Sequence, residues 1–216
     1  MVRARKPKVA GLVRAARDYR DVLLNRNVLL VGVSGEEVRC LQLRFFARHF
    51  MHLTGVRTSR PMRSVVFFHR CVDGRISEHD LRDDVRGLSE VKLEAARAMF
   101  QSDLSATSFG EVNGARLYVG AEGYAGNAWA CLGFVRDGAW HDPMTLLRSP
   151  VSDEVSRSGR YRVVAVFSKE IRERNFGLPE RLSFSDGDDW DEIGKRLPEE
   201  LAYLTLVREE QGQGQG

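Results

Sequence analysis

The spacing of apolar residues changes its period near Gly110, and this change restricts the possible folds more than any other feature of the chain. Before Gly110, apolar side chains recur every three or four residues in segments that are predicted to be amphipathic helices: residues 9–25, 62–72 and 88–103. Beyond it, residues 128–135 and 161–167 are short apolar runs of the kind that form strands. The chain is therefore expected to combine helices from its first half with strands from its second half.

Turn signals indicate how the strands connect. Residues 27–33 and 37–45 flank a small polar turn and predict a β-hairpin, and Asn113-Gly114 predicts another tight turn. The apolar runs near residues 117, 131 and 165 are expected to form an antiparallel sheet. Residues 142–148 contain a proline where a first helical residue can sit, which predicts a capped short helix or a tight loop at the rim of that sheet.

The composition of the two ends differs from that of the middle. Residues 1–8 are a basic extension, and residues 9–175 are expected to form one domain. Residues 176–216 are acidic and predicted to be loop-like, ending in Gln-Gly repeats that cannot bury a core and are expected to be disordered.

The cysteines and the hydropathy pattern exclude several classes of protein. Cys40, Cys71 and Cys131 are odd in number and far apart, which argues against a disulfide framework and against a cysteine-based zinc site. No apolar run has the length of a membrane span or of a signal sequence. We expect a cytoplasmic protein with free thiols and no membrane partner.

Positive charge is concentrated at the start of the chain. Residues 1–63 carry 14 Lys or Arg against four acidic residues, a net +10, whereas residues 64–136 carry −2 and residues 137–216 carry −5. Most of these cations are arginines, which bind phosphate through a bidentate fork. This asymmetry favours a nucleic-acid partner. Two alternatives are a general bias toward arginine and mutual neutralisation of the basic and acidic parts in the fold.

The segment of residues 49–55 carries two imidazoles and a hydroxyl. If it is helical, His49 and His52 share a face, and Gly55 after an apolar run is a usual helix stop. Histidine is the side chain most easily poised for proton transfer near neutral pH. The segment is therefore a candidate site for acid–base chemistry, although paired histidines at this spacing also occur as packing or surface residues.

Four segments resemble the phage-associated branch of the barnase, EndoU, colicin and RelE-like nucleases: residues 50–55, 130–134, 142–147 and a strand over 162–167 that is followed by Ser168-Lys169. The resemblance covers roughly residues 9–175. It implies an α+β fold in which N-terminal helices pack on an antiparallel sheet in a single domain. It also implies a metal-independent ribonuclease activity.

Metal-independent cleavage of RNA requires a base, an acid, and donors that hold the charge on the phosphorane. His52 and His49 are the candidate proton-transfer groups, and Thr54 and Thr145 are candidate hydrogen-bond donors to phosphate. The candidate substrate-binding residues are basic: Arg44, Arg48, Arg57, Arg148 and Lys169.

Each candidate has a structural alternative. Thr54 fits a C-terminal helix residue whose hydroxyl bonds its own turn, Thr145 fits a cap of the turn at Pro143, and each arginine fits a solvated surface.

Other chemistries are less well supported. His49 and His52 have no carboxylate near them in sequence, so we expect no metal site there. Acidic residues around Asp188 lack the spacing of a calcium loop. The glycines form no phosphate-binding pattern, so no cofactor is expected.

The sequence thus predicts a ribonuclease of toxin-like or phage-associated type, with RNA as its partner and a cognate inhibitor or antitoxin protein as a further possible partner. The alternative from another class is a non-catalytic module that binds nucleic acid or protein. The two predictions differ in whether His49, His52, Thr54 and Thr145 converge on one cleft.

Overall fold

The computed structural model describes residues 9–84, 87–112, 120–185 and 188–208. Its helical elements are α1 (Val9–Val22), η1 (Ala47–His49), α2 (Phe50–Thr54), α3 (Ser64–Val72), η2 (Glu78–Asp80), α4 (Leu88–Met99), α5 (Val151–Glu154), α6 (Trp190–Gly194) and η4 (Glu199–Arg208), where η marks a 3₁₀ helix. Its strands are β1 (Arg26–Ser34), β2 (Glu37–Phe45), β3 (Ser108–Val112), β4 (Gly123–Gly126), β5 (Cys131–Asp137), β6 (Trp140–Leu147), β7 (Val155–Glu170) and β8 (Pro179–Leu182).

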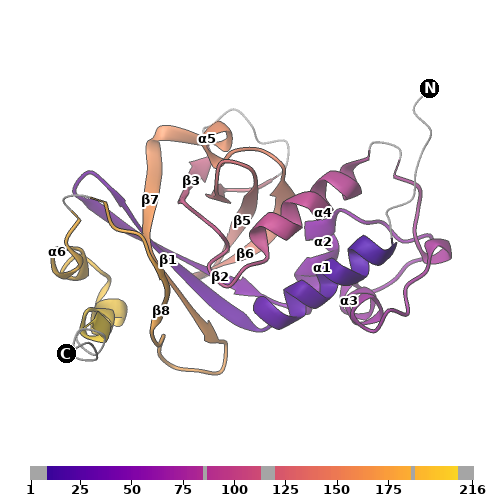
Figure 1. The fold of residues 1–216 in the computed structure, drawn as a ribbon, viewed down its shortest axis with the longest axis horizontal. Helices are drawn as coiled ribbons and strands as arrows, with labels where there is room; N and C mark the ends of the chain where they lie inside the picture. The colour runs from indigo at the N-terminus through magenta and orange to yellow at the C-terminus, as the bar shows by residue number, and fades with distance from the viewer. Residues whose placement is uncertain (1–8, 85–86, 113–119, 186–187, 209–216) are drawn as a thin grey trace.

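The described strands form one eight-stranded sheet in the order β1-β2-β6-β5-β4-β3-β7-β8. Because β1 also pairs with β7, the sheet curls and closes on itself, with β8 outside the ring (Figure 1). The pairings are antiparallel except between β2 and β6, where Leu43 pairs with His141 in parallel. Helices α1 to α4 gather at one end of this sheet (Figure 1). The α+β fold in a single domain, with N-terminal helices packed on the sheet, is therefore confirmed.

The local predictions for the first half of the chain are also confirmed. The amphipathic pattern forms α1, whose buried residues share one face, and the hairpin forms from β1 and β2. Helix α2 ends before Gly55, which adopts a left-handed φ of 65° and donates its N–H to the carbonyl oxygen of His52. The Asn113-Gly114 turn, the apolar run near residue 117, the N-terminal extension and the Gln-Gly tail lie outside the described residues.

An aromatic cluster holds the short helix α2 in place. Tyr19 of α1 contacts Phe45, Phe50, Phe68 and Phe100 in edge-on geometry, with ring centroids 5.2 to 6.2 Å apart. Its hydroxyl donates a hydrogen bond of 2.9 Å to the carbonyl oxygen of Phe46. Aromatic pairs of this kind add stabilisation beyond the area they bury. The position of α2, and of the histidine segment, is therefore set by the main core.

Two predictions for the second half are wrong. Residues 142–148 are neither a helix nor a tight loop, because most of them belong to β6, which lies between β2 and β5 rather than at the rim of the sheet. The segment after Phe176 is also not loop-like throughout, because it forms β8, α6 and η4. Trp190 and Leu201 of this segment bury against Phe167 and its neighbours in a second core cluster.

Across the described residues, no helix combines the length and the apolar character needed to cross a membrane.

Candidate active site

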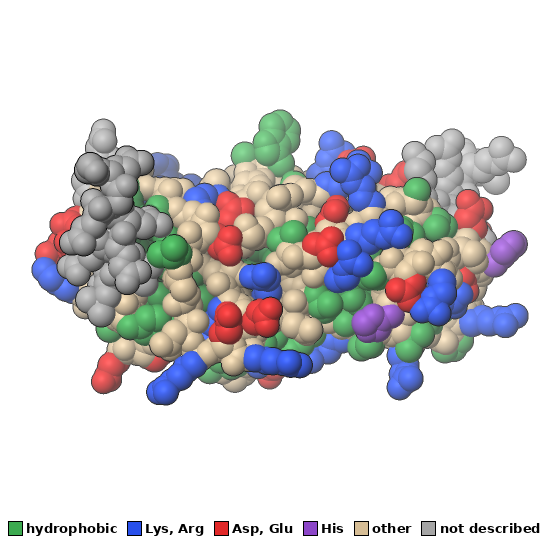
Figure 2. All heavy atoms as spheres, turned by 60° about the horizontal axis from the view of Figure 1, so that its bottom comes forward, with side chains coloured by type: hydrophobic (Ala, Val, Ile, Leu, Met, Phe, Trp, Pro, Cys, Tyr) green, Lys and Arg blue, Asp and Glu red, His purple; other side chains and the backbone are tan. Residues whose placement is uncertain are grey.

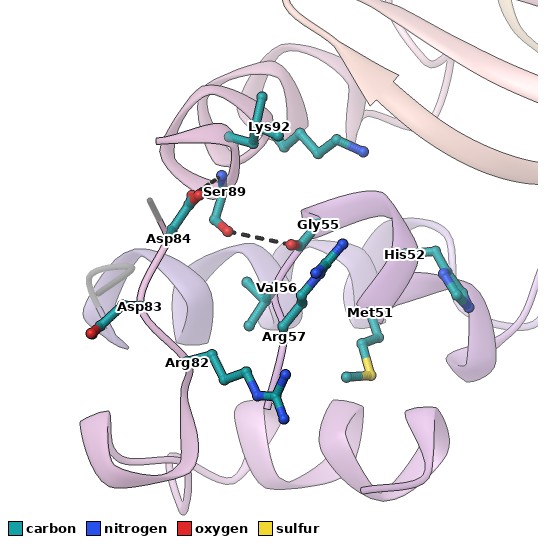
Figure 3. A pocket seen from close by; sticks show the side chains of 11 residues that line it. Met51, His52, Gly55, Val56, Arg57, Arg82, Asp83, Asp84, Ser89 and Lys92 are labelled. Carbon is teal, nitrogen blue, oxygen red and sulfur yellow. Dashed lines mark hydrogen bonds between the residues drawn. The ribbon is translucent and has the colours of Figure 1, made fainter. Parts of the chain in front are cut away.

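A cleft of about 720 Å³ opens at the C-terminal end of α2. It lies between α2, the first turns of α4 and the segment around residues 82–84 (Figure 3). The residues that line it are Met51, His52, Gly55, Val56, Arg57, Arg82, Asp83, Asp84, Leu88, Ser89 and Lys92.

Backbone contacts hold the walls of the cleft together. A bridge joins Thr58 and Leu81, and the N–H of Arg82 donates to the carbonyl oxygen of Arg57 at 2.9 Å. The hydroxyl of Ser89, in the first turn of α4, donates to the carbonyl oxygen of Gly55 at 3.4 Å. The two cleft arginines therefore lie on neighbouring segments that are tied to each other.

The cleft has an asymmetric charge distribution. Figure 3 shows His52 at one end, Asp83 and Asp84 at the other, and Arg57 and Arg82 between them. His52, Arg57 and Arg82 are exposed, and none forms an ion pair with another residue of the described segments. Since the carboxylates repel phosphate, an anionic substrate is expected to occupy the end near His52.

Lys92 is a cleft residue that sequence reasoning missed. Its Nζ donates a hydrogen bond of 2.7 Å to Oγ1 of Thr145, and burial lowers its pKa below the usual 10.5. It forms no ion pair with a carboxylate among the described residues. A Cβ at Gly55 would lie 2.7 Å from Cδ of Lys92, so the glycine makes room for the lysine as well as ending α2. The sequence does contain a signal for this residue, because the helical spacing places Lys92 on the same face as the buried residues Ser89, Ala96 and Met99.

The two predicted threonines have different surroundings. Thr54 is fully buried, and its hydroxyl donates to the carbonyl oxygen of Met51 at 3.1 Å, as in the structural alternative. Thr145 is 3% exposed and lies within β6, so it does not cap a turn at Pro143. It faces α4, on the side of the sheet that carries α2, and it reaches the cleft through Lys92.

His49 is separated from the cleft by burial. Its Nδ1 accepts the backbone N–H of Phe46 at 3.2 Å, so the proton of the neutral ring resides on Nε2, which donates to Oδ2 of Asp142 at 3.3 Å. Burial lowers the pKa of His49 from 6.5 to about 4, against the opposing attraction of Asp142. The sequence showed no carboxylate near the histidines, but the fold brings Asp142 to His49.

We expect the neutral His49 to make the fold sensitive to acid. In the unfolded chain a histidine takes up a proton near pH 6.5, whereas folded His49 takes it up near pH 4, so acidification favours the unfolded state. The free energy of unfolding, measured by urea denaturation, should fall by about 2 kcal/mol between about pH 7.5 and pH 5 through this residue. His49→Gln should remove this component, and His69→Gln, at an exposed histidine, should retain it. An imidazole of His49 that titrates near pH 6.5 by NMR would contradict the prediction.

Most of the predicted substrate-binding cations are already paired outside the cleft. Arg44 pairs with Asp137 at 2.9 Å, and Arg48 pairs with Asp142 at 2.8 Å. Arg148 pairs with Glu94 at 2.8 Å, and Nζ of Lys169 donates to the carbonyl oxygen of Arg174 at 2.6 Å. Arg57 alone of the five predicted cations lines the cleft.

These pairs also account for part of the charge gradient along the chain. Arg39, Arg44 and Arg48, from the basic first third, bind carboxylates from later in the sequence. Figure 2 shows one face of the molecule on which Lys and Arg side chains are interspersed with Asp and Glu. Mutual neutralisation in the fold therefore applies to this part of the basic region.

Comparison with known proteins identifies one family. The family model described as phage-Barnase-EndoU-ColicinE5/D-RelE like nuclease4 matches residues 11–175. No curated protein and no solved structure matches the chain. The described residues contain no group of three or more His, Cys, Asp or Glu side chains placed to hold a metal ion.

Proposed function

Because the chain belongs to the family of phage-Barnase-EndoU-ColicinE5/D-RelE like nucleases, we propose that it is a ribonuclease that cleaves RNA by acid–base chemistry without a metal ion. The observation that carries this proposal is the cleft at the end of α2, which one exposed imidazole and three cationic side chains line together. An imidazole can move a proton near neutral pH, and arginine and lysine can hold the phosphate.

The geometry supports a division of roles in the cleft. His52 takes the proton of the 2′-hydroxyl of RNA, and the 2′-oxygen then attacks the adjacent phosphorus. The bond between phosphorus and the 5′-oxygen breaks, the departing 5′-oxygen takes a proton from water, and a 2′,3′-cyclic phosphate remains on the other product. Arg57 and Arg82 bind the non-bridging phosphate oxygens, and Lys92 stabilises the negative charge that builds up on the phosphorane. Thr145 acts through Lys92, as a residue that positions the ammonium group. Thr54 and His49 have no role in this scheme, because both side chains are buried and form hydrogen bonds outside the cleft.

The proposal includes a cellular setting. The three cysteines are free, and burial raises the pKa of each thiol to about 12, so they are inert thiols of the kind found in a reducing cytoplasm. A ribonuclease in that compartment threatens its host, which favours a toxin-like or phage-associated role and a cognate inhibitor protein that covers the cleft.

The test is cleavage of labelled RNA by the purified protein in EDTA. We expect cuts in tRNA or mRNA, with a 2′,3′-cyclic phosphate on one product, and no cut in DNA of the same sequence. A single 2′-deoxy substitution at the cut site should abolish cleavage there, since it removes the nucleophile. Loss of activity in EDTA would contradict metal independence. Binding of RNA without any cleavage would identify the chain as the non-catalytic module.

Salt dependence of binding tests the two cleft arginines. Replacing Arg57 or Arg82 by alanine should reduce the slope of log Kd against log salt by about 0.7 for each lost contact with single-stranded RNA. Arg44→Ala should leave the slope unchanged, because its guanidinium already binds Asp137. Fluorescence anisotropy with 2′-O-methyl RNA, which cannot be cleaved by this route, measures the slope. Arg60→Ala, at an exposed arginine outside the cleft, is the matched control, and an equal loss in that variant would contradict the assignment.

A further inference from the structure

Trp129 is held out of the protein surface by a tightly bonded turn between β4 and β5. Its exposed fraction is 79%. Among the other exposed large apolar side chains of the described residues, the highest exposed fraction is the 54% of Leu178. A single exposed apolar side chain is ordinary on a protein surface. An indole this exposed leaves a large apolar area in contact with water. The hydrogen bonds that hold its backbone show whether this exposed position is fixed by the fold.

Asn127 fixes the turn that carries the indole. Its Oδ1 accepts the N–H of Trp129 at 2.8 Å and that of Ala130 at 3.1 Å. Its Nδ2 donates to the carbonyl oxygen of Ser105 at 3.1 Å, and its carbonyl oxygen accepts the N–H of Val151 at 2.9 Å. The turn is thus bonded to two other segments, one of them α5 (Figure 1). The backbone of Trp129 is therefore ordered before any partner binds.

The turn lies beside the elements that build the cleft. Cys131 of β5 pairs with Leu147 of β6, which directly precedes Arg148. Arg148, just after β6, pairs with Glu94 of α4 at 2.8 Å. The Lys92–Thr145 hydrogen bond likewise connects α4 with β6. Arg148 follows Thr145 by three residues, which is about 10 Å of extended chain. The side chain of Arg148 is 62% exposed despite its ion pair, which leaves it accessible to phosphate.

We propose that Trp129 is a stacking platform for an unpaired base of a single-stranded nucleic acid, with Arg148 beside it on the phosphate backbone. This inference rests on the proposed function, since it gives the same substrate a second contact beyond the cleft. A flat indole on a fixed turn, with a cation on the neighbouring strand, fits a base followed by its phosphate, and base stacking on an aromatic side chain tolerates any base. A base within a duplex is already stacked and gains nothing from the indole.

The test is the affinity of the full chain for labelled 2′-O-methyl RNA, measured by fluorescence anisotropy. Trp129→Ala should raise Kd by roughly 5- to 150-fold, the range expected for one stacked base, whereas Trp129→Phe should retain most of the affinity. The salt dependence should stay as in the parent, because no phosphate contact is lost. Leu178→Ala, at another exposed apolar residue, should bind like the parent.

Two further probes separate this inference from the proposed function. An abasic oligonucleotide and a blunt duplex should bind the parent and Trp129→Ala equally well. If the parent binds and cleaves RNA but Trp129→Ala has the parent's affinity, the stacking platform is wrong while the ribonuclease stands, and Trp129 is then a candidate protein contact. If the parent does not bind single-stranded nucleic acid at all, both proposals are wrong.

Discussion

Replacing His52 by alanine is expected to lower the rate of RNA cleavage by roughly 10²- to 10⁴-fold, which is the usual contribution of a positioned proton-transfer group. His52 is exposed at one end of the cleft that Lys92 and the two cleft arginines also line, so its imidazole is accessible to a substrate. The affinity for uncleavable RNA should change little, because Arg57 and Arg82 still bind phosphate.

The matched control is His69→Ala, which removes an exposed imidazole from α3 and should leave the rate unchanged. Both variants should unfold at the same urea concentration as the parent, because neither side chain is buried. Equal rates of cleavage for His52→Ala and the parent would show that the proton-transfer group is elsewhere. An effect on Kd as large as the effect on the rate would assign His52 to binding instead.

The local patterns of the first half were predictable because they depend on neighbours in sequence. Amphipathic spacing, the small turn after Ser34 and the glycine after α2 each act within a few residues. The class of fold and the family came from short segments spread over the chain, and the family model matches nearly the same region.

Strand β6 was missed because its proline signal has two physical meanings. A proline can begin a helix, but it can also sit at a bulge, where its missing N–H leaves no ladder bond unmade. Phe134 pairs with Pro143 and Gly133 pairs with Thr145, so the register shifts at Met144 and the proline lies next to the irregularity. Only the partner strand distinguishes these two meanings.

The packing of the C-terminal segment was missed although its sequence carries a helical spacing. Its buried residues recur every three or four positions: Trp190, Ile193, Leu197, Leu201 and Leu204. Acidic residues between them resemble a solvated charge run. Asp188 in fact binds Arg162 at 2.6 Å, and Asp189 accepts the N–H of Asp191 at the start of α6. The acidic cluster is therefore in part a set of structural contacts.

The candidate site was only partly predictable, since proximity in sequence does not determine which side chains share a cleft. His52 and Arg57 flank Gly55 and enter the cleft together. Lys92 and Arg82 come from segments far along the chain, and the partner of His49 is 93 residues away. A polar side chain on a buried helical face, as at Lys92, is the sequence signal that points to such a residue.

Lys92 carries the second large expected effect. Its ammonium group is partly buried and contacts a hydroxyl rather than a carboxylate. Burial therefore costs desolvation energy that no ion pair offsets. Replacing a buried charge by an apolar side chain of similar volume is often neutral or stabilising. Lys92→Met should therefore fold at least as stably as the parent in urea, and a loss of activity cannot then be attributed to unfolding.

We expect Lys92→Met to lower the rate of cleavage by about 10²- to 10³-fold, the effect of removing one preorganised donor to the charge of a transition state. The loss should appear in kcat more than in Kd for uncleavable RNA. Lys92→Arg should not restore the rate, because the longer planar group cannot fit where Gly55 already leaves little room for the lysine stem. Thr145→Val should have a smaller effect, since it removes the hydroxyl that positions the ammonium and keeps the charge. If Lys92→Met cleaves RNA at the parent's rate, the buried ammonium is structural, and the charge on the phosphorane must be held by Arg57 and Arg82.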